Sequence, residues 1–229
     1  ATSVYLVDRT IPMLPERLCN LLCSLRPNEE KLAYSAIFEM NDKAEVKNSR
    51  ITKTIIKSDR RFTYEEAQAV IETGEGEFKD EILKLNELAQ ILRKNRMAAG
   101  AVDFDRVEVR FEIDEKGKPL SVYFKESKEA NKLIEEFMLL ANRTVAECIG
   151  KVPKNKKAKV FPYRIHDLPD PDKLDNLNWF VNRFGYKIRT SGSKTEVSKS
   201  INKLLHEIKG KKEQNLVEMV SLKAMQKAK

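Results

Sequence analysis

The sequence predicts an α+β protein, a mixed fold in which antiparallel hairpins are covered by helices. Two pairs of segments alternate apolar and polar residues on either side of a turn, which is typical of β-hairpins. Several longer segments repeat apolar residues with the period of an amphipathic helix. The 229 residues are 41% hydrophobic and 34% charged, as in globular proteins that bury a core.

The first hairpin is predicted at residues 31–40 and 46–58, because both segments alternate and the residues NDKAE between them favour a turn. The second is predicted at residues 106–113 and 119–127, with Gly117 in its turn.

Three helices are predicted around these hairpins. Thr63 and Glu66 have the spacing of a capping box, and Gly74 with Gly76 ends the helix that they open. A longer helix is predicted from Lys79 to Ala99. The third covers residues 128–150, with Gly150 as its C-cap. Its apolar face comprises Leu133, Phe137, Leu140 and Ala141.

Beyond residue 150 the pattern changes. Residues 159–166 read as a strand, and helices are predicted within residues 169–185, 194–210 and 213–229. The chain begins with Ala inside an extended segment, and its last helix has no terminating residue. We therefore expect a piece of a longer protein, truncated at both ends.

The net charge of +8 is unevenly distributed. Residues 1–150 contain 24 Lys and Arg against 27 Asp and Glu, whereas residues 151–229 contain 19 against eight. The basic part opens with KVPKNKKAKVFPYR, and a domain division is expected in its linker at residues 151–158. Two interpretations stand: a solvated connector, or a surface for a polyanion such as RNA.

No apolar run approaches the 18 residues of a membrane span, and no leader pattern is found, so the cytoplasm is the expected compartment. Cys19 and Cys23 are four residues apart in a predicted helix, where they are expected to be small buried thiols. A zinc site would have few ligands, since the only histidines are His166 and His206.

Two groups of aspartates favour structural roles. The cluster of Asp167, Asp170, Asp172 and Asp175 lacks the glycine and the final glutamate of a calcium loop, so capping of the next helix is predicted. Asp103 and Asp105 form a lone D-x-D, which indicates a loop.

Glu135 and Glu136 raise the question of acid or base catalysis. Adjacent helical residues point about 100° apart, so at most one of them faces a site. The pattern favours Glu135 for a semi-buried role, because it shares a face with Asn131. The competing interpretation is a pair of solvated glutamates.

Motifs for zinc proteases, P-loop enzymes, serine hydrolases and Cys-His nucleophiles are absent from the sequence. The residues alone therefore indicate a basic α/β fragment, for which nucleic-acid binding is one of the two interpretations of its charge, and they do not identify an enzyme.

Four long stretches of the sequence can be compared with known families: TSVYLVDRTIPMLPERLCNLLCSLRPNEEKLAYS, AAGAVDFDRVEVRF, SKEANKLIEEFMLLANRTVAE and RIHDLPDPDKL. In this order they closely resemble the catalytic (RNB-type) domain of the RNase II and RNase R family of exoribonucleases, and bacterial RNase R members match best. The chain is thereby expected to be the central part of one such domain.

The resemblance implies processive hydrolysis of single-stranded RNA from its 3′ end to nucleoside 5′-monophosphates, with Mg²⁺ activating the attacking water. The family's metal-binding aspartates follow the spacing D-x5-D-x-D-D, which does not occur here, and its arginine-bearing TSPIRRY motif is also absent. We therefore expect no catalytic residue and no metal ligand within these residues, no metal bound to the isolated chain, and a monomeric, inactive fragment.

The resemblance assigns three residues to RNA binding. Tyr5 matches the aromatic that stacks on the 3′-terminal base, and Phe104 matches the second aromatic of the clamp. Glu135 matches a glutamate that contacts the terminal nucleotide. Two alternatives stay open: a non-catalytic RNA-binding or regulatory protein on the same scaffold, and phosphorolysis, for which no glycine-rich phosphate cradle is found.

Overall fold

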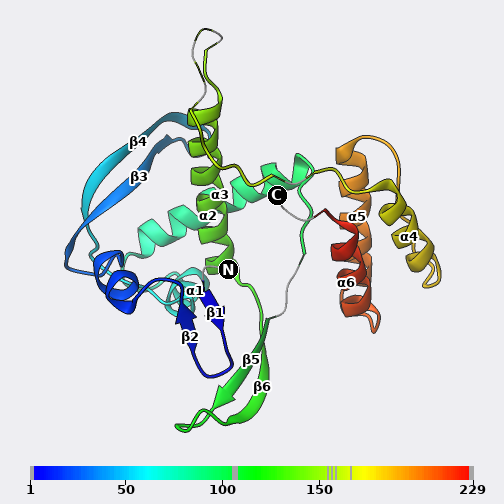
Figure 1. Cartoon of the computed structure of the whole chain (residues 1–229), viewed down its shortest axis with the longest axis horizontal. Helices are drawn as coiled ribbons and strands as arrows, with labels where there is room; N and C mark the ends of the chain where they lie inside the picture. Colours follow the sequence, from blue (N-terminus) through cyan, green and yellow to red (C-terminus); the bar gives the residue numbers. More distant parts are fainter. Residues whose placement is uncertain are drawn as a thin grey trace. The chain divides into compact units, whose positions relative to one another are not determined.

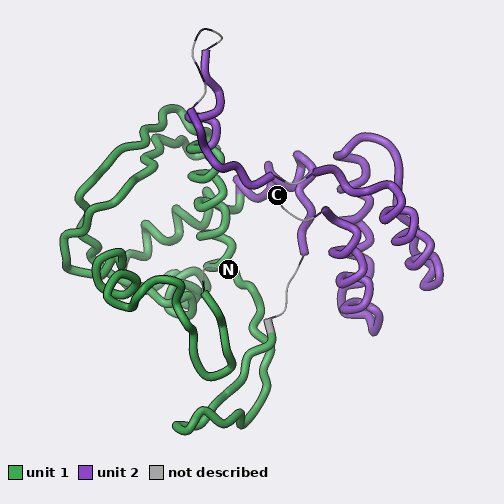
Figure 2. Tube along the Cα trace, in the orientation of Figure 1, with its two compact units in different colours: residues 1–90, 105–145 green, residues 91–104, 146–229 purple. Residues whose placement is uncertain are grey.

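The computed structural model describes residues 3–104, 108–153, 155, 157, 159–165 and 167–226. The chain divides into two compact units, which Figure 2 colours separately. The hairpin unit comprises residues 1–90 and 105–145, and the helical unit comprises residues 91–104 and 146–229. The predicted α+β class is confirmed, because helices accompany purely antiparallel strand pairs (Figure 1).

The hairpin unit contains three separate two-stranded antiparallel sheets. Both hairpins predicted from the sequence are found, and a short one precedes them. The pairs are β1 (Ser3–Tyr5) with β2 (Thr10–Pro12), β3 (Glu30–Met40) with β4 (Val46–Lys57), and β5 (Glu108–Ile113) with β6 (Pro119–Lys125).

Side chains fix the turn of the β3–β4 hairpin. The Asn41 Oδ1 atom accepts the backbone N–H groups of Lys43 (3.1 Å) and Glu45 (2.9 Å), which closes the chain on itself. Farther along the ladder, the hydroxyl groups of Ser35 and Thr54 lie 2.7 Å apart across the two strands.

Helix α1 (Tyr64–Thr73) begins at the predicted capping box. The Thr63 Oγ1 atom accepts the Glu66 N–H (3.1 Å), while the Glu66 carboxylate accepts the Thr63 N–H (2.7 Å). The helix ends at Gly74, whose φ of +71° is left-handed backbone that glycine adopts without strain.

Helices α2 (Lys79–Ala98) and α3 (Glu129–Gly150) are the two longest. The predicted end of α3 at Gly150 is confirmed, but the predicted C-cap role is wrong, because the residue lies inside the helix and its φ is not positive. A Cβ atom at this position would lie 2.6 Å from the Tyr163 hydroxyl oxygen. The glycine therefore permits the close approach of Tyr163.

The helical unit is built around α4 (Pro171–Asn182), α5 (Lys194–Ile208) and α6 (Gln214–Ala224), and α6 contacts both other helices. Its buried core explains why these segments hold together, since each helix supplies one apolar face. The core comprises Leu174, Leu177, Val181, Tyr186, Ile188, Val197, Ile201, Leu204, Leu205, Ile208, Val217 and Ala224.

Two predictions in this part of the chain are wrong. The described residues of the expected strand at 159–166 form no strand, because Pro162 has no N–H to donate and no partner pairs with the segment. Val160 is fully exposed there. The last helix ends at Ala224, where Met225 turns to extended backbone, although the sequence indicated continuation beyond it; residues 227–229 of that prediction lie outside the described residues.

The cysteines also differ from expectation. Cys19 is half-buried and Cys23 is exposed, so they are not buried thiols. Cys19 lies within a single π-helical turn, η1 (Arg17–Leu22), and Cys23 is its C-cap; η1 has no buried residue. Among the described residues, no helix is both long and apolar enough to cross a membrane.

Candidate nucleic-acid interface

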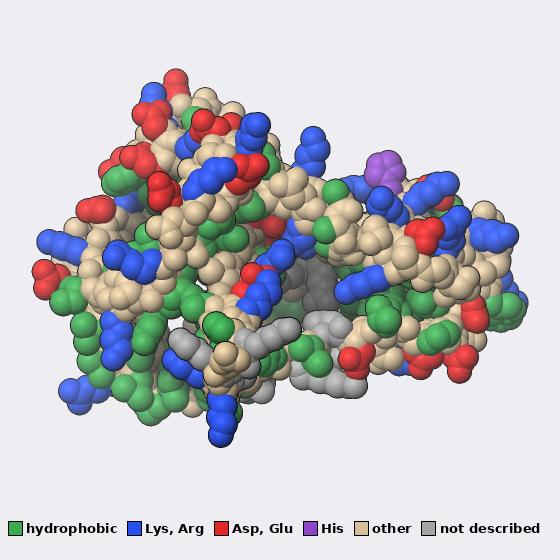
Figure 3. All heavy atoms as spheres, turned by 90° about the horizontal axis from the view of Figure 1, so that it is seen from above, with side chains coloured by type: hydrophobic (Ala, Val, Ile, Leu, Met, Phe, Trp, Pro, Cys, Tyr) green, Lys and Arg blue, Asp and Glu red, His purple; other side chains and the backbone are tan. Residues whose placement is uncertain are grey.

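The basic part of the sequence, residues 151–229, folds into the helical unit. Figure 3 shows Lys and Arg side chains over its surface, in the right-hand part of that view. Residues 151–229 carry 19 basic residues against eight acidic ones, so this unit presents a positive surface to any polyanion.

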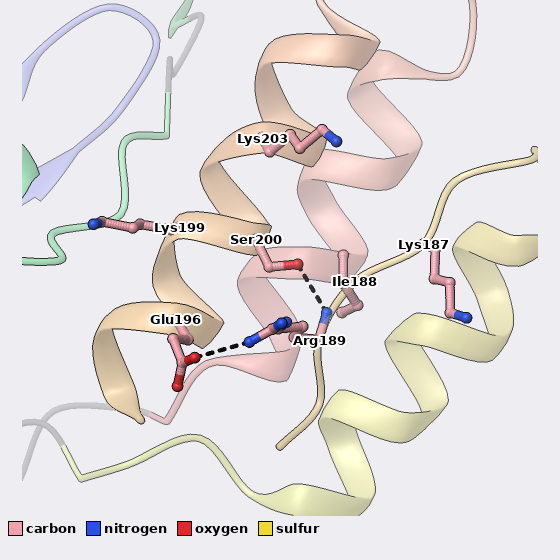
Figure 4. A pocket seen from close by; sticks show the side chains of 7 residues that line it. All are labelled: Lys187, Ile188, Arg189, Glu196, Lys199, Ser200 and Lys203. Carbon is pink, nitrogen blue, oxygen red and sulfur yellow. Dashed lines mark hydrogen bonds and ion pairs between the residues drawn. The ribbon is translucent and has the colours of Figure 1, made fainter. Parts of the chain in front are cut away.

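A groove of about 550 Å³ lies in this surface, between α5 and the segment that precedes it (Figure 4). Four cationic side chains and one carboxylate line it. The lining residues are Lys187, Ile188, Arg189, Glu196, Lys199, Ser200 and Lys203.

Arg189 is held in place by α5. Its guanidinium lies 2.8 Å from the Glu196 carboxylate, and its backbone N–H donates to the Ser200 Oγ atom at 2.8 Å. Hydrogen bonds from the backbone and side chain of Ser193 lower the pKa of Glu196 below its usual range, and Arg189 adds to this effect. Glu196 therefore takes part both in the N-terminal cap of α5, through Ser193, and in the groove, through Arg189.

The lysines of the groove are less constrained. Within the chain as described, Lys187 and Lys199 form no ion pair, and Lys203 lies 3.7 Å from Glu207. Figure 4 shows the Lys199 ammonium group on one side of α5 and those of Lys187 and Lys203, well separated, on the other. Such spread charges suit an extended chain of phosphates better than a single phosphate group.

Tyr5 is the last residue of β1, where it pairs with Thr10 of β2. The hairpin closes through a 2.8 Å hydrogen bond from the Leu6 N–H to the Arg9 carbonyl oxygen. The Tyr5 side chain is 77% exposed, so its ring faces are open to an incoming base. The RNA-binding role implied for Tyr5 stays a prediction.

The two adjacent glutamates of α3 have opposite surroundings. Glu135 is exposed, whereas Glu136 is only 3% exposed, so the expectation of a semi-buried Glu135 is wrong. The face of α3 that carries Leu133 and Glu136 is the buried one. The exposure of Glu135 leaves its carboxylate accessible, and its predicted contact with the terminal nucleotide stays a prediction.

Phe104 lies in a loop that is fastened to α5. The Asn202 side chain accepts the Asp103 N–H (3.1 Å) and donates to the Ala101 carbonyl oxygen (2.8 Å). The Asp103 carboxylate also pairs with Arg93 at 2.6 Å. Phe104 itself is half-buried against the core of the helical unit. Its role in the RNA clamp stays a prediction.

Asp103 therefore lies in a loop, as predicted, while Asp105 is outside the described residues. Asp170 caps α4, since its carboxylate accepts the Asp172 N–H at 3.0 Å. In the described ranges, no group of three or more His, Cys, Asp or Glu side chains could hold a metal ion. These residues offer no set of ligands that fits Mg²⁺.

The structure thus divides the predicted residues between its units. Tyr5 and Glu135 belong to the hairpin unit, and Phe104 belongs to the helical unit. The groove residues were not singled out from the sequence, although the charge excess beyond residue 150 pointed to their region. The spacing of Lys199 and Lys203, four residues apart on α5, was the local signal.

The chain belongs to the RNB domain family, whose model matches residues 1–229. This confirms the resemblance found in the sequence. Ribonuclease R of Aquifex aeolicus is 36% identical over 236 residues, which cover 99% of this chain and 32% of the relative. DIS3-like exonuclease 2 of Schizosaccharomyces pombe is 40% identical over 209 residues, which cover 84% of this chain and 22% of that relative. The chain thus spans about a third or less of these curated relatives.

Solved structures give the same fold. Mycoplasma genitalium RNase R in complex with ribose-methylated single-stranded RNA matches with a TM-score of 0.84 and 26% identity, over 99% of this chain and 35% of that one. Yeast Ssd1, described as a pseudonuclease, matches with a TM-score of 0.70 and 17% identity, over 99% of this chain and 27% of that one. The second likeness establishes the fold alone.

Proposed function

We propose that this chain is the central part of the catalytic domain of a 3′-to-5′ exoribonuclease, which hydrolyses single-stranded RNA processively to nucleoside 5′-monophosphates. The match of the RNB family model to all 229 residues is the observation that carries this proposal. The relatives named as ribonuclease R support it, as does the RNA in the complex of the M. genitalium enzyme.

Within this function, the chain's own residues hold RNA. Tyr5 supplies an exposed aromatic face for the last base, because stacking grips any sequence equally. The exposed Glu135 carboxylate contacts the terminal nucleotide, and Phe104 closes the other end of the stacked bases. The basic groove of the helical unit binds the phosphate backbone.

The chemistry itself is proposed to use Mg²⁺, held by aspartates that the family motif places outside these residues. When bound, the metal would activate the attacking water and stabilise the leaving oxygen. The isolated chain is proposed to be an inactive monomer, and the intact protein to act in the cytoplasm.

A second candidate function is RNA binding without catalysis. The charge excess of residues 151–229 favours RNA binding whether or not catalysis occurs, and the same fold occurs in a protein described as a pseudonuclease. The two functions differ in one property of the intact protein, the release of nucleotides.

The proposal is tested with the intact protein, Mg²⁺ and single-stranded RNA labelled at either end. We expect 3′-labelled RNA to release labelled mononucleotide at once, and 5′-labelled RNA to shorten gradually. The product should be the monophosphate whether or not inorganic phosphate is present, and EDTA should stop its release. Binding without release would support the non-catalytic candidate, and nucleoside diphosphates would indicate phosphorolysis.

A further inference from the structure

The chain's single tryptophan, Trp179, lies on α4 and is 63% exposed as a residue. It lines a groove of about 400 Å³ between α4 and α6, separate from the basic groove beside α5. The lining residues are Lys173, Asn176, Leu177, Trp179, Phe180, Val220, Lys223 and Ala224. A large aromatic face is therefore available beside an apolar groove.

The floor of this groove is built from packed residues of the core. Leu177 and Ala224 are buried members of the core of the helical unit, and Phe180 and Val220 pack against that core. The contact between α4 and α6 fixes their spacing. A flat group that entered the groove would meet a surface that is already formed, with little ordering cost.

The surroundings of Trp179 are cationic. The Arg183 guanidinium lies 4.8 Å from the centre of the indole ring, one helical turn along α4, in cation–π geometry. Lys173 and Lys223 stand on the two helices that border the groove, and its lining includes no acidic residue. The groove is therefore complementary to an anionic ligand that also has a flat aromatic part.

We propose that this groove binds one unpaired base of single-stranded RNA, stacked on Trp179, with the flanking phosphates against Lys173 and Lys223. The proposal rests on the RNA-binding function proposed above and adds a site to it. Aromatic faces with nearby cations bind single strands because each base stacks while its phosphate is neutralised. An apolar protein segment would fill the groove without using these cations, so RNA is favoured.

The test uses the emission of Trp179 in the 229-residue chain, where no other tryptophan contributes. A single-stranded oligoribonucleotide is titrated in at low salt, and binding is followed in parallel by the anisotropy of a label on the RNA. We expect the emission to fall in step with binding. An oligomer with abasic sugars should bind through its phosphates and leave the emission unchanged.

Variants separate stacking from charge. Trp179→Ala should weaken RNA binding about tenfold without changing its salt dependence, and Trp179→Phe should restore much of the affinity. Lys223→Gln should weaken binding more than Lys212→Gln, which removes an equal charge from an exposed position outside the groove. Far-UV circular dichroism checks that each variant is folded.

The outcomes distinguish the two proposals. RNA that binds while Trp179 emission stays constant would overturn the base site and leave the RNA-binding function intact, and an abasic oligomer that quenches as strongly as RNA would also overturn it. An absence of any RNA binding would overturn the proposed RNA-binding function and this site together.

Discussion

At the scale of single residues, the surroundings of a side chain decide what each candidate site residue can do. The sequence predicted only some of these surroundings. Helical spacing established that Glu135 and Glu136 face different ways, yet it selected the wrong one as buried. Periodicity gives the angle between two side chains, whereas burial depends on which neighbours cover each face. The C-cap role predicted for Gly150 was wrong for the same reason. The glycine there permits the close approach of Tyr163, which lies beyond the helix in sequence.

Tyr5 provides the test at this scale. In the intact protein, Tyr5→Ala should remove about 1 to 3 kcal/mol of binding to the last nucleotides, because one stacked base is lost. The end products should become longer or less uniform, with less effect on turnover than a change to a metal ligand. Gel analysis of the limit products measures their length.

The exposure of Tyr5 predicts little change in thermal stability for the same variant. Tyr34→Ala is the matched control, since this tyrosine is also exposed in a hairpin of the same unit. It should leave both product length and melting temperature unchanged. An unchanged product length for Tyr5→Ala would refute its role in the clamp.

At the scale of elements, local signals succeeded where local chemistry determines structure. The capping box at Thr63 and Glu66 and the cap of α4 by Asp170 were predicted, because these hydrogen bonds join neighbouring residues. The strand at 159–166 was wrong because a strand also needs a partner, which alternation within one segment cannot supply.

The cap of α5 gives a prediction for stability. The Ser193 Oγ atom accepts the Glu196 N–H at 3.3 Å, so Ser193→Ala should destabilise the helical unit by about 1 kcal/mol. That loss corresponds to about 2 to 4 °C in melting temperature for a chain of this size. Ser191→Ala, an exposed serine outside the helix, should change nothing measurable by calorimetry.

The same cap predicts a dependence on pH. The folded-state pKa of Glu196 is lowered, first by its hydrogen bonds with Ser193 and then by Arg189. Its contribution to stability is therefore fully present above the unfolded pKa, about 4.3, and is lost as pH falls through the lower folded value. The advantage of wild type over Glu196→Gln in melting temperature should be present at pH 7 and vanish in strong acid. A melting-temperature advantage of wild type over Glu196→Gln that grows as pH falls would contradict a lowered folded-state pKa.

At the scale of the whole molecule, composition predicted the basic character of residues 151–229 but not the groove that this charge forms. The groove joins Lys187 and Arg189 to Lys199 and Lys203 of α5, and only the folded helical unit brings these segments together. The aromatic groove at Trp179 likewise requires α4 and α6 to pack. The first groove depends on how α5 packs against the segment just before it, and the second depends on contact between α4 and α6, which are more than 30 residues apart along the chain.

Charge in the basic groove should control the salt dependence of RNA binding. If Lys199 and Lys203 each neutralise one phosphate, replacing both by Gln should reduce the slope of log K against log salt by about 1.4, at about 0.7 per phosphate on single strands. Lys53→Gln with Lys57→Gln removes the same charge from exposed positions on β4. This control pair should leave the slope unchanged, and equal effects of both pairs would contradict a specific groove.

We propose that these 229 residues hold RNA for an exoribonuclease whose metal chemistry lies elsewhere in the protein. A direct test incubates the isolated chain with 5′-labelled single-stranded RNA and Mg²⁺, following binding by native gel and products by denaturing gel. We expect a shifted complex that weakens with salt, and RNA of unchanged length. Release of nucleoside monophosphates that EDTA abolishes, or RNA that is neither bound nor shortened, would contradict it.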